Sequence, residues 1–148
     1  MQFNMDHSLG FVLNKTAFAS KNRFNQIIKK YGISPEQWSV LFRVVEHNGG
    51  ISQKALADST YKDQGNLTRM VDKLIEKGYI KREADVDDRR AIRLFATEKS
   101  IALAKVVAPL SSSHNENMTI GFSHEEKATL ITLLNKVYHN IQKDEYEK

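Results

Sequence analysis

The sequence predicts a mainly α-helical protein that carries one small β-hairpin. Two prolines and seven glycines interrupt its 148 residues, and most stretches between them repeat apolar residues at spacings of three and four, as on one face of a helix. The spacing changes to alternation at Ile92–Ala96, which predicts a half-exposed strand. The length suits one folding unit, so we expect residues 1–148 to form a single domain.

The composition excludes several classes of protein. Cysteine is absent, which excludes disulfides, thiolate metal sites and thiol redox sensing. No apolar run reaches bilayer length and the first residues do not resemble a secretory signal, so we expect a soluble, cytoplasmic protein without a membrane partner. The net charge of +4 permits a polyanionic partner but does not require one.

Two helices are expected in the first third of the chain. The first runs from about Ser8 to Tyr31 and ends at Gly32. The second begins at Ser34–Gln37, where the serine and the glutamine can form a capping box around a proline in the first turn. Residues 48–50, Asn-Gly-Gly, end this helix.

Two closely linked helices follow in the middle of the chain. Ser52 can cap the first of them. Thr60, three residues before Asp63, has the spacing of a cap for the second. The second helix buries the stripe Leu67, Met70, Val71, Leu74 and Ile75 and ends at Gly78.

A hairpin and two helices complete the predicted order. A strand at Tyr79–Glu83 pairs with Ile92–Ala96 through an Asp-rich connector. A fifth helix starts after Thr97, and Pro109 with the serines behind it predicts a kink or break. Ser123–Glu126 is a second capping box, and it opens a last helix that ends near Lys143.

This order of elements is typical of a winged helix-turn-helix. The sequence resembles the MarR (multiple antibiotic resistance regulator) family over nearly its whole length. The most specific match is Asp88-Arg89-Arg90, followed by Arg93, Leu94 and Thr97, which is similar to that family's D-x-R signature ending in Leu-Thr. Ala96 stands where the family has a leucine. The resemblance implies a DNA-binding core at about 33–97 and dimerisation helices at about 8–31 and 98–143.

The resemblance also implies a function. It predicts a homodimeric transcription regulator that binds a near-palindromic operator in double-stranded DNA, with a small-molecule effector often altering the affinity. Repression is favoured over activation because a dimer on a promoter can exclude polymerase, although the sequence does not distinguish the two. The alternative is a winged-helix module that binds protein. An enzyme is a third reading, for which no catalytic residues or Gly-rich phosphate loop are recognisable.

The second of the two middle helices corresponds to the family's recognition helix, and its exposed face is predicted to meet DNA. It lies opposite the buried stripe at 100° per residue. Arginine can pair with guanine and asparagine with adenine, while Gly65 leaves the helix free to approach the groove floor. A solvated polar face is the alternative, and it is about as good an explanation for Asn66. The predicted contacts are Lys62, Gln64, Gly65, Asn66, Thr68, Arg69 and Lys73.

The hairpin and the preceding helix supply the other predicted contacts. The hairpin holds a basic cluster of Lys81, Arg82, Arg89, Arg90 and Arg93. An arginine at the wing tip can enter a minor groove, and others can meet phosphates; the predicted contacts are Arg89, Arg90 and Arg93. We expect Asp88 to pair with Arg90 and shape the tip. A mixed-charge loop is the alternative. Ser52, Gln53 and Lys54 are predicted to contact phosphate, although capping alone explains the serine equally well.

The terminal helices carry apolar stripes that a compact winged-helix core cannot cover, which predicts a dimer interface. Its candidate residues are Phe11, Val12, Leu130, Leu134, Val137 and Ile141. Glu46, His47 and His114 only faintly echo zinc-sensing members of the family, so we predict no metal and no cofactor. Tyr31, Trp38 and Phe42 could line an effector pocket, but aromatic residues at this spacing are more often core.

Overall fold

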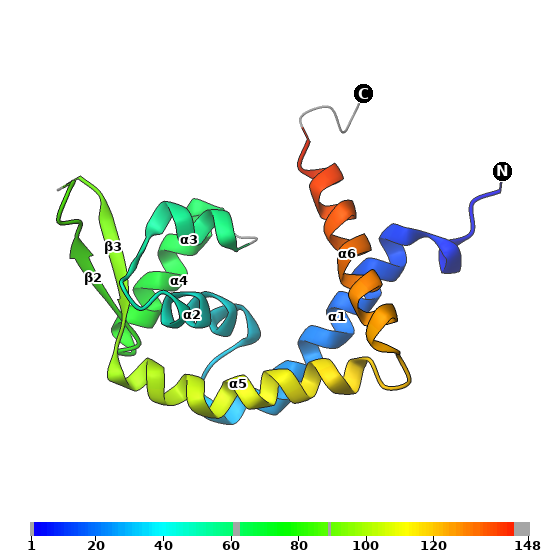
Figure 1. Ribbon diagram of the computed structural model, residues 1–148, viewed down its shortest axis with the longest axis horizontal. Helices are drawn as coiled ribbons and strands as arrows, with labels where there is room; N and C mark the ends of the chain where they lie inside the picture. The colour runs from blue at the N-terminus through cyan, green and yellow to red at the C-terminus, as the bar shows by residue number, and fades with distance from the viewer. Residues whose placement is uncertain (1, 61–62, 89, 144–148) are drawn as a thin grey trace. The chain divides into compact units, whose positions relative to one another are not determined.

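The computed structural model describes residues 2–60, 63–88 and 90–143. Six α-helices and three short strands are assigned in these ranges (Figure 1). Backbone contacts divide the chain into two compact units, residues 1–112 and 113–148. Helix α5 (Glu98–Met118) spans the boundary between them. In the described ranges, no helix is both long and apolar enough to cross a bilayer.

Helix α1 (Leu9–Ile28) confirms the first predicted helix. Ser8 caps it by accepting a hydrogen bond from the Phe11 backbone N–H. A 3₁₀ turn over Lys29–Tyr31 extends it to Gly32, whose φ of 74° is left-handed. A glycine suits this position because a Cβ disfavours such a backbone angle.

The predicted caps also start α2 (Pro35–Glu46) and α3 (Gln53–Ser59). The Ser34 N–H donates to Gln37 Oε1 at 3.1 Å and the Gln37 N–H donates to Ser34 Oγ at 3.2 Å, which completes the capping box. Ser52 Oγ accepts from the Ala55 N–H at 3.0 Å. These local bonds satisfy backbone donors that the first turn of a helix leaves free.

The predicted cap of the recognition helix is wrong. Helix α4 (Gln64–Glu76) is capped by Asp63 rather than by Thr60. Thr60 instead closes α3, because its backbone N–H and its hydroxyl both donate to the Leu56 carbonyl, at 3.1 and 3.0 Å. The threonine is therefore engaged at the preceding helix, and the aspartate supplies the oxygen that α4 needs.

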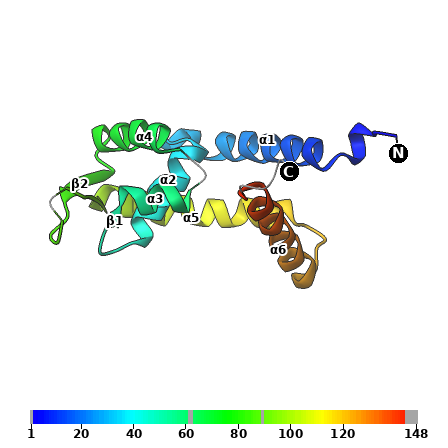
Figure 2. The same cartoon turned by 90° about the horizontal axis from the view of Figure 1, so that it is seen from above.

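The sheet has three antiparallel strands in the order β1-β3-β2. Strands β2 (Ile80–Ala84) and β3 (Ile92–Ala96) form the predicted hairpin, which projects beyond the helices of the first unit in both views (Figure 2). Strand β1 (Ile51–Ser52) pairs Ile51 with Leu94 and was not predicted. Two residues are too few to show a strand periodicity.

The core lies within the first unit, and side chains from α1, α2, α3, α4, α5 and the sheet form it. Its fully buried side chains include Leu56 of α3, Leu67, Val71 and Leu74 of α4, and Leu94 of β3. Burying each such side chain contributes about 1.5–3 kcal/mol to folding. This packing fixes which face of α4 remains outside.

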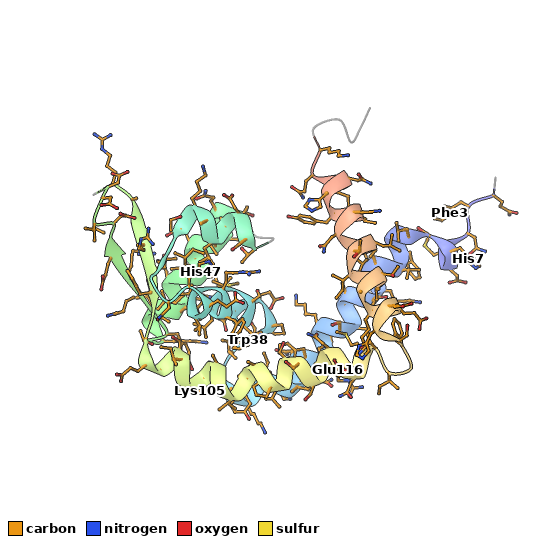
Figure 3. The ribbon with its side chains drawn as sticks, in the orientation of Figure 1. Phe3, His7, Trp38, His47, Lys105 and Glu116 are labelled. Atoms are coloured by element: carbon orange, nitrogen blue, oxygen red, sulfur yellow. The ribbon has the colours of Figure 1, made fainter. Side chains whose placement is uncertain are left out.

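The aromatic residues considered for an effector pocket belong to this core. Trp38, labelled in Figure 3, is buried, and its ring centroid lies 5.1 Å from that of Phe42. Phe42 and Tyr31 are partly buried against the same cluster. The packing interpretation therefore accounts for all three.

Helix α5 contradicts the break predicted at Pro109, while the kink stays a prediction. It continues through Pro109 without a break, although proline removes one backbone hydrogen bond. Ala104 and Val107 are buried in the core beside this position. Tertiary packing of one face therefore outweighs the local preference of the proline.

The second unit contains the end of α5 and helix α6 (His124–Ile141). Ser123 and Glu126 form the predicted capping box, with bonds of 2.9 and 3.1 Å. Lys127 Nζ lies 2.8 Å from Glu116 Oε2 and lowers the pKa of that carboxyl. The connection to α6 passes through Gly121, which has a φ of 88°.

Candidate nucleic-acid interface

Helix α4 presents a polar face on the side opposite the core. Five of the predicted contact residues on it are exposed, namely Gln64, Gly65, Asn66, Arg69 and Lys73. Thr68 is partly buried, and Gln53 Nε2 of α3 donates to its hydroxyl oxygen at 2.8 Å. This bond joins two predicted DNA contacts and ties α3 to α4. Lys62 lies outside the described residues.

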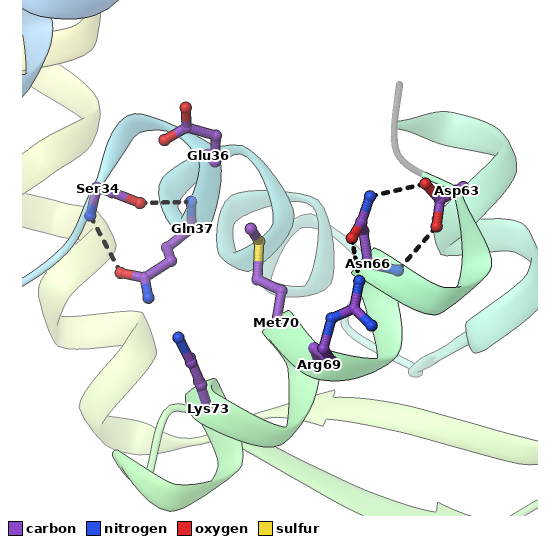
Figure 4. A pocket seen from close by; sticks show the side chains of 8 residues that line it. All are labelled: Ser34, Glu36, Gln37, Asp63, Asn66, Arg69, Met70 and Lys73. Atoms are coloured by element: carbon purple, nitrogen blue, oxygen red, sulfur yellow. Dashed lines mark hydrogen bonds between the residues drawn. The ribbon is translucent and has the colours of Figure 1, made fainter.

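The exposed polar residues of α4 are connected by hydrogen bonds. Asp63 accepts the Asn66 backbone N–H on Oδ1 at 2.8 Å and the Asn66 side-chain amide on Oδ2 at 2.7 Å. Asn66 Oδ1 in turn accepts from Arg69 Nη2. The three side chains therefore form a continuous row along one face of the helix (Figure 4). Asp63 was predicted only as part of a cap, and the row was not foreseen.

A surface pocket borders this row. It lies between the start of α2 and the exposed face of α4, and its lining combines carboxylates, amides and two cations (Figure 4). The lining residues are Ser34, Glu36, Gln37, Asp63, Asn66, Arg69, Met70 and Lys73. The pocket therefore places Lys73 and Arg69 of α4 beside the capping box of α2.

Arg93 of the wing has internal partners. Its Nε lies 3.2 Å from Asp85 Oδ2, and its Nη1 donates to the Gly50 and Gly49 carbonyls at 3.1 and 3.4 Å. The Asp87 backbone N–H and the Arg93 guanidinium hold the pKa of Asp85 below its ordinary value. The guanidinium thus ties the hairpin to the turn before β1, a role that the predicted DNA contact did not include.

Asp88 shapes the wing tip through backbone bonds. Its Oδ1 accepts the Arg90 backbone N–H at 3.0 Å, and its carbonyl accepts the Ala91 N–H at 3.0 Å. The expected pairing with Arg90 thus involves the backbone of that residue, because short aspartate side chains bond readily to neighbouring amides. The Arg90 residue is exposed at the tip, and Arg89 lies outside the described residues.

Another ion pair connects the wing to α4, the recognition helix. Arg82 Nη2 of β2 lies 2.7 Å from Asp72 Oδ1 of α4. Neither residue was among the predicted contacts. Arg82 was counted only in the basic cluster of the hairpin, and its pairing with Asp72 depends on how the hairpin packs beside α4. Ser52 of β1 caps α3 by accepting through Oγ, and Lys54 of α3 is exposed.

The candidate metal ligands have other contacts. Glu46 pairs with Arg43 at 3.2 Å, and His47 Nδ1 lies 2.7 Å from the Arg43 carbonyl. Within residues 2–60, 63–88 and 90–143, no group of three acidic or histidine side chains is placed to hold a metal ion.

Most of the predicted dimer-interface residues are exposed apolar side chains. In the first unit, Phe11 and Val12 of α1 are 36% and 38% exposed. In the second unit, Leu130 and Leu134 of α6 are each 40% exposed and Ile141 is 48% exposed, while Val137 is partly buried. Further exposed apolar residues are Leu9, Phe18, Ile131, Leu133 and Tyr138. Exposed apolar surface of this extent is typical of an interaction site.

The chain is similar to known transcriptional regulators. The sequence model of the MarR family matches residues 33–92. An uncharacterized HTH-type transcriptional regulator of Bacillus subtilis, YybA, is 35% identical over 125 residues, which cover 81% of this chain and 80% of that protein.

Solved structures give the same result for the fold. A mutant MarR of E. coli in complex with operator DNA has a TM-score of 0.82 at 25% identity, covering 93% of this chain and 98% of that one. The transcriptional regulator SlyA has a TM-score of 0.82 at 26% identity, covering 92% and 96%.

Proposed function

This chain belongs to the MarR family of transcriptional regulators, and we propose that it is a homodimeric repressor that binds a near-palindromic operator through α4 and the β2–β3 hairpin. The observation that carries this proposal is the exposed polar face of α4, which presents Arg69 and Lys73, while Arg90 is exposed at the tip of the wing. An α-helix fits the major groove, and an arginine there can pair with the O6 and N7 atoms of guanine.

The proposed contacts divide into two groups by chemistry. Arg69 reads a base in the major groove, while Gln64, Gly65, Thr68 and Lys73 border the same face of α4. The phosphate and minor-groove contacts position the protein without reading a major-groove base edge. We assign to this second group Ser52, Gln53, Lys54, Lys62, Arg89 and Arg90.

The proposal includes a second copy of the chain. The exposed stripes of α1 and α6 would be covered by a two-fold partner. Two-fold symmetry would place the recognition helices about one DNA turn apart, roughly 34–36 Å, so that two half-site affinities combine on one palindrome. We further propose that the protein works in the cytoplasm without catalysis, cofactor or metal, and that a small-molecule effector modulates its DNA affinity.

The test measures binding to DNA directly. Fluorescence anisotropy with a duplex from the region upstream of the protein's own gene should give a lower Kd than a shuffled duplex, and the affinity should fall steeply with salt. Arg69→Ala should weaken operator binding by about 1–3 kcal/mol with a much smaller effect on shuffled DNA.

Arg23→Ala is a matched control, since it removes the same charge from an exposed position on α1. It should leave the preference for operator unchanged. Equal losses on both duplexes for Arg69→Ala would reassign Arg69 to phosphate. Affinity that is flat between low and physiological salt would contradict DNA as the partner and favour a protein-binding winged helix.

A further inference from the structure

The row formed by Asp63, Asn66 and Arg69 has a direction. Residues three apart lie on the same face of a helix, so each side chain can reach the next. Asp63 accepts two hydrogen bonds from Asn66, one from its backbone and one from its amide. Asn66 then offers its remaining polar atom, Oδ1, to Arg69. The carboxylate thus fixes which way the amide points, and the amide oxygen fixes the guanidinium.

This arrangement argues against Asn66 as a reader of adenine. A bidentate contact to adenine needs both the donor and the acceptor of the amide. In the structure the amide donates one N–H to Asp63 and accepts from Arg69. These two bonds fix its orientation and leave one N–H and one lone pair, so the amide would have to share or break them to pair with adenine. Arg69 differs, because a guanidinium carries five N–H donors and enough remain for a pair of bonds to guanine.

We propose that Asp63 is a positioning residue that sets the base preference of α4 by holding Arg69 through Asn66. This inference rests on the proposed DNA-binding function and assigns its specificity to a row of three side chains. Arginine has many rotamers, and a guanidinium held in place before binding loses less freedom when it pairs with a base.

For removal of Asp63, the proposal predicts a change in DNA affinity opposite to the change expected from its charge alone. A carboxylate near DNA repels phosphates, so its removal should by charge alone tighten binding to every duplex. Removal of a positioning residue should instead weaken binding to the preferred sequence while binding to other sequences stays equal or tightens. The two explanations therefore predict opposite changes on the preferred DNA.

Asp63→Ser separates the row from the helix cap. Serine is a good N-cap, so α4 should keep its first turn and the protein its melting temperature. Serine has no second oxygen to hold the Asn66 amide. Asp58→Ser is the matched control, because it removes the same charge from an exposed position on α3.

The DNA probe is a duplex that the full-length wild-type protein selects from a random-sequence pool. Asp63→Ser and Asn66→Ala should each raise the Kd for this duplex about three- to tenfold, with no increase for unselected DNA. In an Arg69→Ala background, neither change should weaken binding further. Asp58→Ser should weaken binding neither to the selected duplex nor to unselected DNA.

Three results would overturn the proposal. Tighter binding of Asp63→Ser to both duplexes would mean that its charge alone acts on DNA. A full additional loss in the Arg69→Ala background would mean that Asp63 acts independently of Arg69. Repeating the selection with Asn66→Ala would oppose the proposal if an adenine preference disappeared while the guanine preference stayed intact.

A measurement without DNA distinguishes this inference from the proposed function. In ¹⁵N NMR spectra of the free protein, the side-chain amide protons of Asn66, assigned by their loss in Asn66→Ala, should exchange slowly in the wild type and rapidly in Asp63→Ser. Rapid exchange in the wild type would overturn the row even if DNA binding is specific. If exchange is slow but no sequence is selected, the proposed function fails, and the specificity role fails with it.

Discussion

Gly50 is the glycine at which an added Cβ would make the shortest contacts. Its φ of 86° is left-handed, and an added Cβ would lie 2.6 Å from the Phe95 ring and 2.8 Å from Arg93 Cγ. Gly50→Ala should therefore destabilise the fold by about 1–3 kcal/mol, through backbone strain and displacement of β3. Urea unfolding measures this change. Gly49→Ala is the control, since nothing lies within 4 Å of its added Cβ; equal losses for both variants would contradict the argument.

Asp85 should make the stability of the wing depend on pH. The Asp87 backbone N–H and Arg93 lower its pKa in the folded protein below the ordinary value of 3.8. A carboxyl with a lowered folded pKa stabilises the fold above its unfolded pKa and loses that effect as pH falls through the folded pKa. Wild type should thus exceed Asp85→Asn in stability at neutral pH, and the difference should shrink below about pH 3.8.

Chemical unfolding across this pH range tests the prediction. Part of the difference should also disappear in an Arg93→Ala background, because the guanidinium is one of the two main causes of the lowered pKa. A difference that stays constant with pH would show that Asp85 acts through its shape and hydrogen bonds rather than through its charge.

The residue types in this chain predicted the kind of chemistry better than they predicted which groups each side chain contacts. Arginines in the wing signature pointed to DNA, yet Arg93 bonds to Asp85 and to two glycine carbonyls. The two glycine carbonyls reach Arg93 only when β3 pairs with β1, because they lie more than forty positions away in the sequence. Asp88 could be associated with Arg90 from sequence because that bond is local.

At the scale of elements, helix starts were predictable where one side chain serves one helix. Ser34 and Ser123 each form a capping box within their own first turn. Between α3 and α4 the signals overlap, because Thr60 and Asp63 both suit a cap and only packing decides which helix each one serves. Strand β1 could not be predicted, since its pairing with β3 is its only strand feature.

Pro109 provides a test of how packing overrides local preference in α5. Proline inside a helix lacks an N–H and costs about 3 kcal/mol relative to alanine, partly offset by the restricted unfolded chain. Because α5 is continuous at this position, Pro109→Ala should stabilise the protein by about 1–2 kcal/mol. Ser112→Ala, which adds helix propensity but no N–H donor, should change stability by only a few tenths. Thermal unfolding of both variants measures these changes in stability. No gain in stability for Pro109→Ala would mean that the helix depends on the proline.

At the scale of the whole molecule, the net charge of +4 carries little information. What indicates DNA is the distribution of the charges: Arg69 and Lys73 lie on the exposed face of α4, while Arg82 and Arg93 are paired with carboxylates. The order of elements predicted the fold, but only the packed structure separates the cations on the exposed face of α4 from the arginines that pair with carboxylates in the wing.

The last prediction concerns the second copy of the chain. Leu134 and Val137 lie on the stripe of α6 that also carries Leu130 and Ile141, and most of this stripe is exposed within its unit. Aspartates at both positions would place charges in the proposed interface, where burial of an unpaired charge is strongly unfavourable. The double variant should therefore be monomeric or insoluble, and it should lose tight operator binding without any change in a DNA-contacting residue.

Thr132→Asp is the control for this experiment, because at 100° per residue it lies on the side of α6 opposite the stripe. It should remain dimeric and bind DNA. Analytical ultracentrifugation gives the oligomeric state, and anisotropy with the same operator gives the affinity. A wild-type protein that sediments as a folded monomer at micromolar concentration, yet binds its operator tightly, would contradict the dimer and the role assigned to the terminal helices.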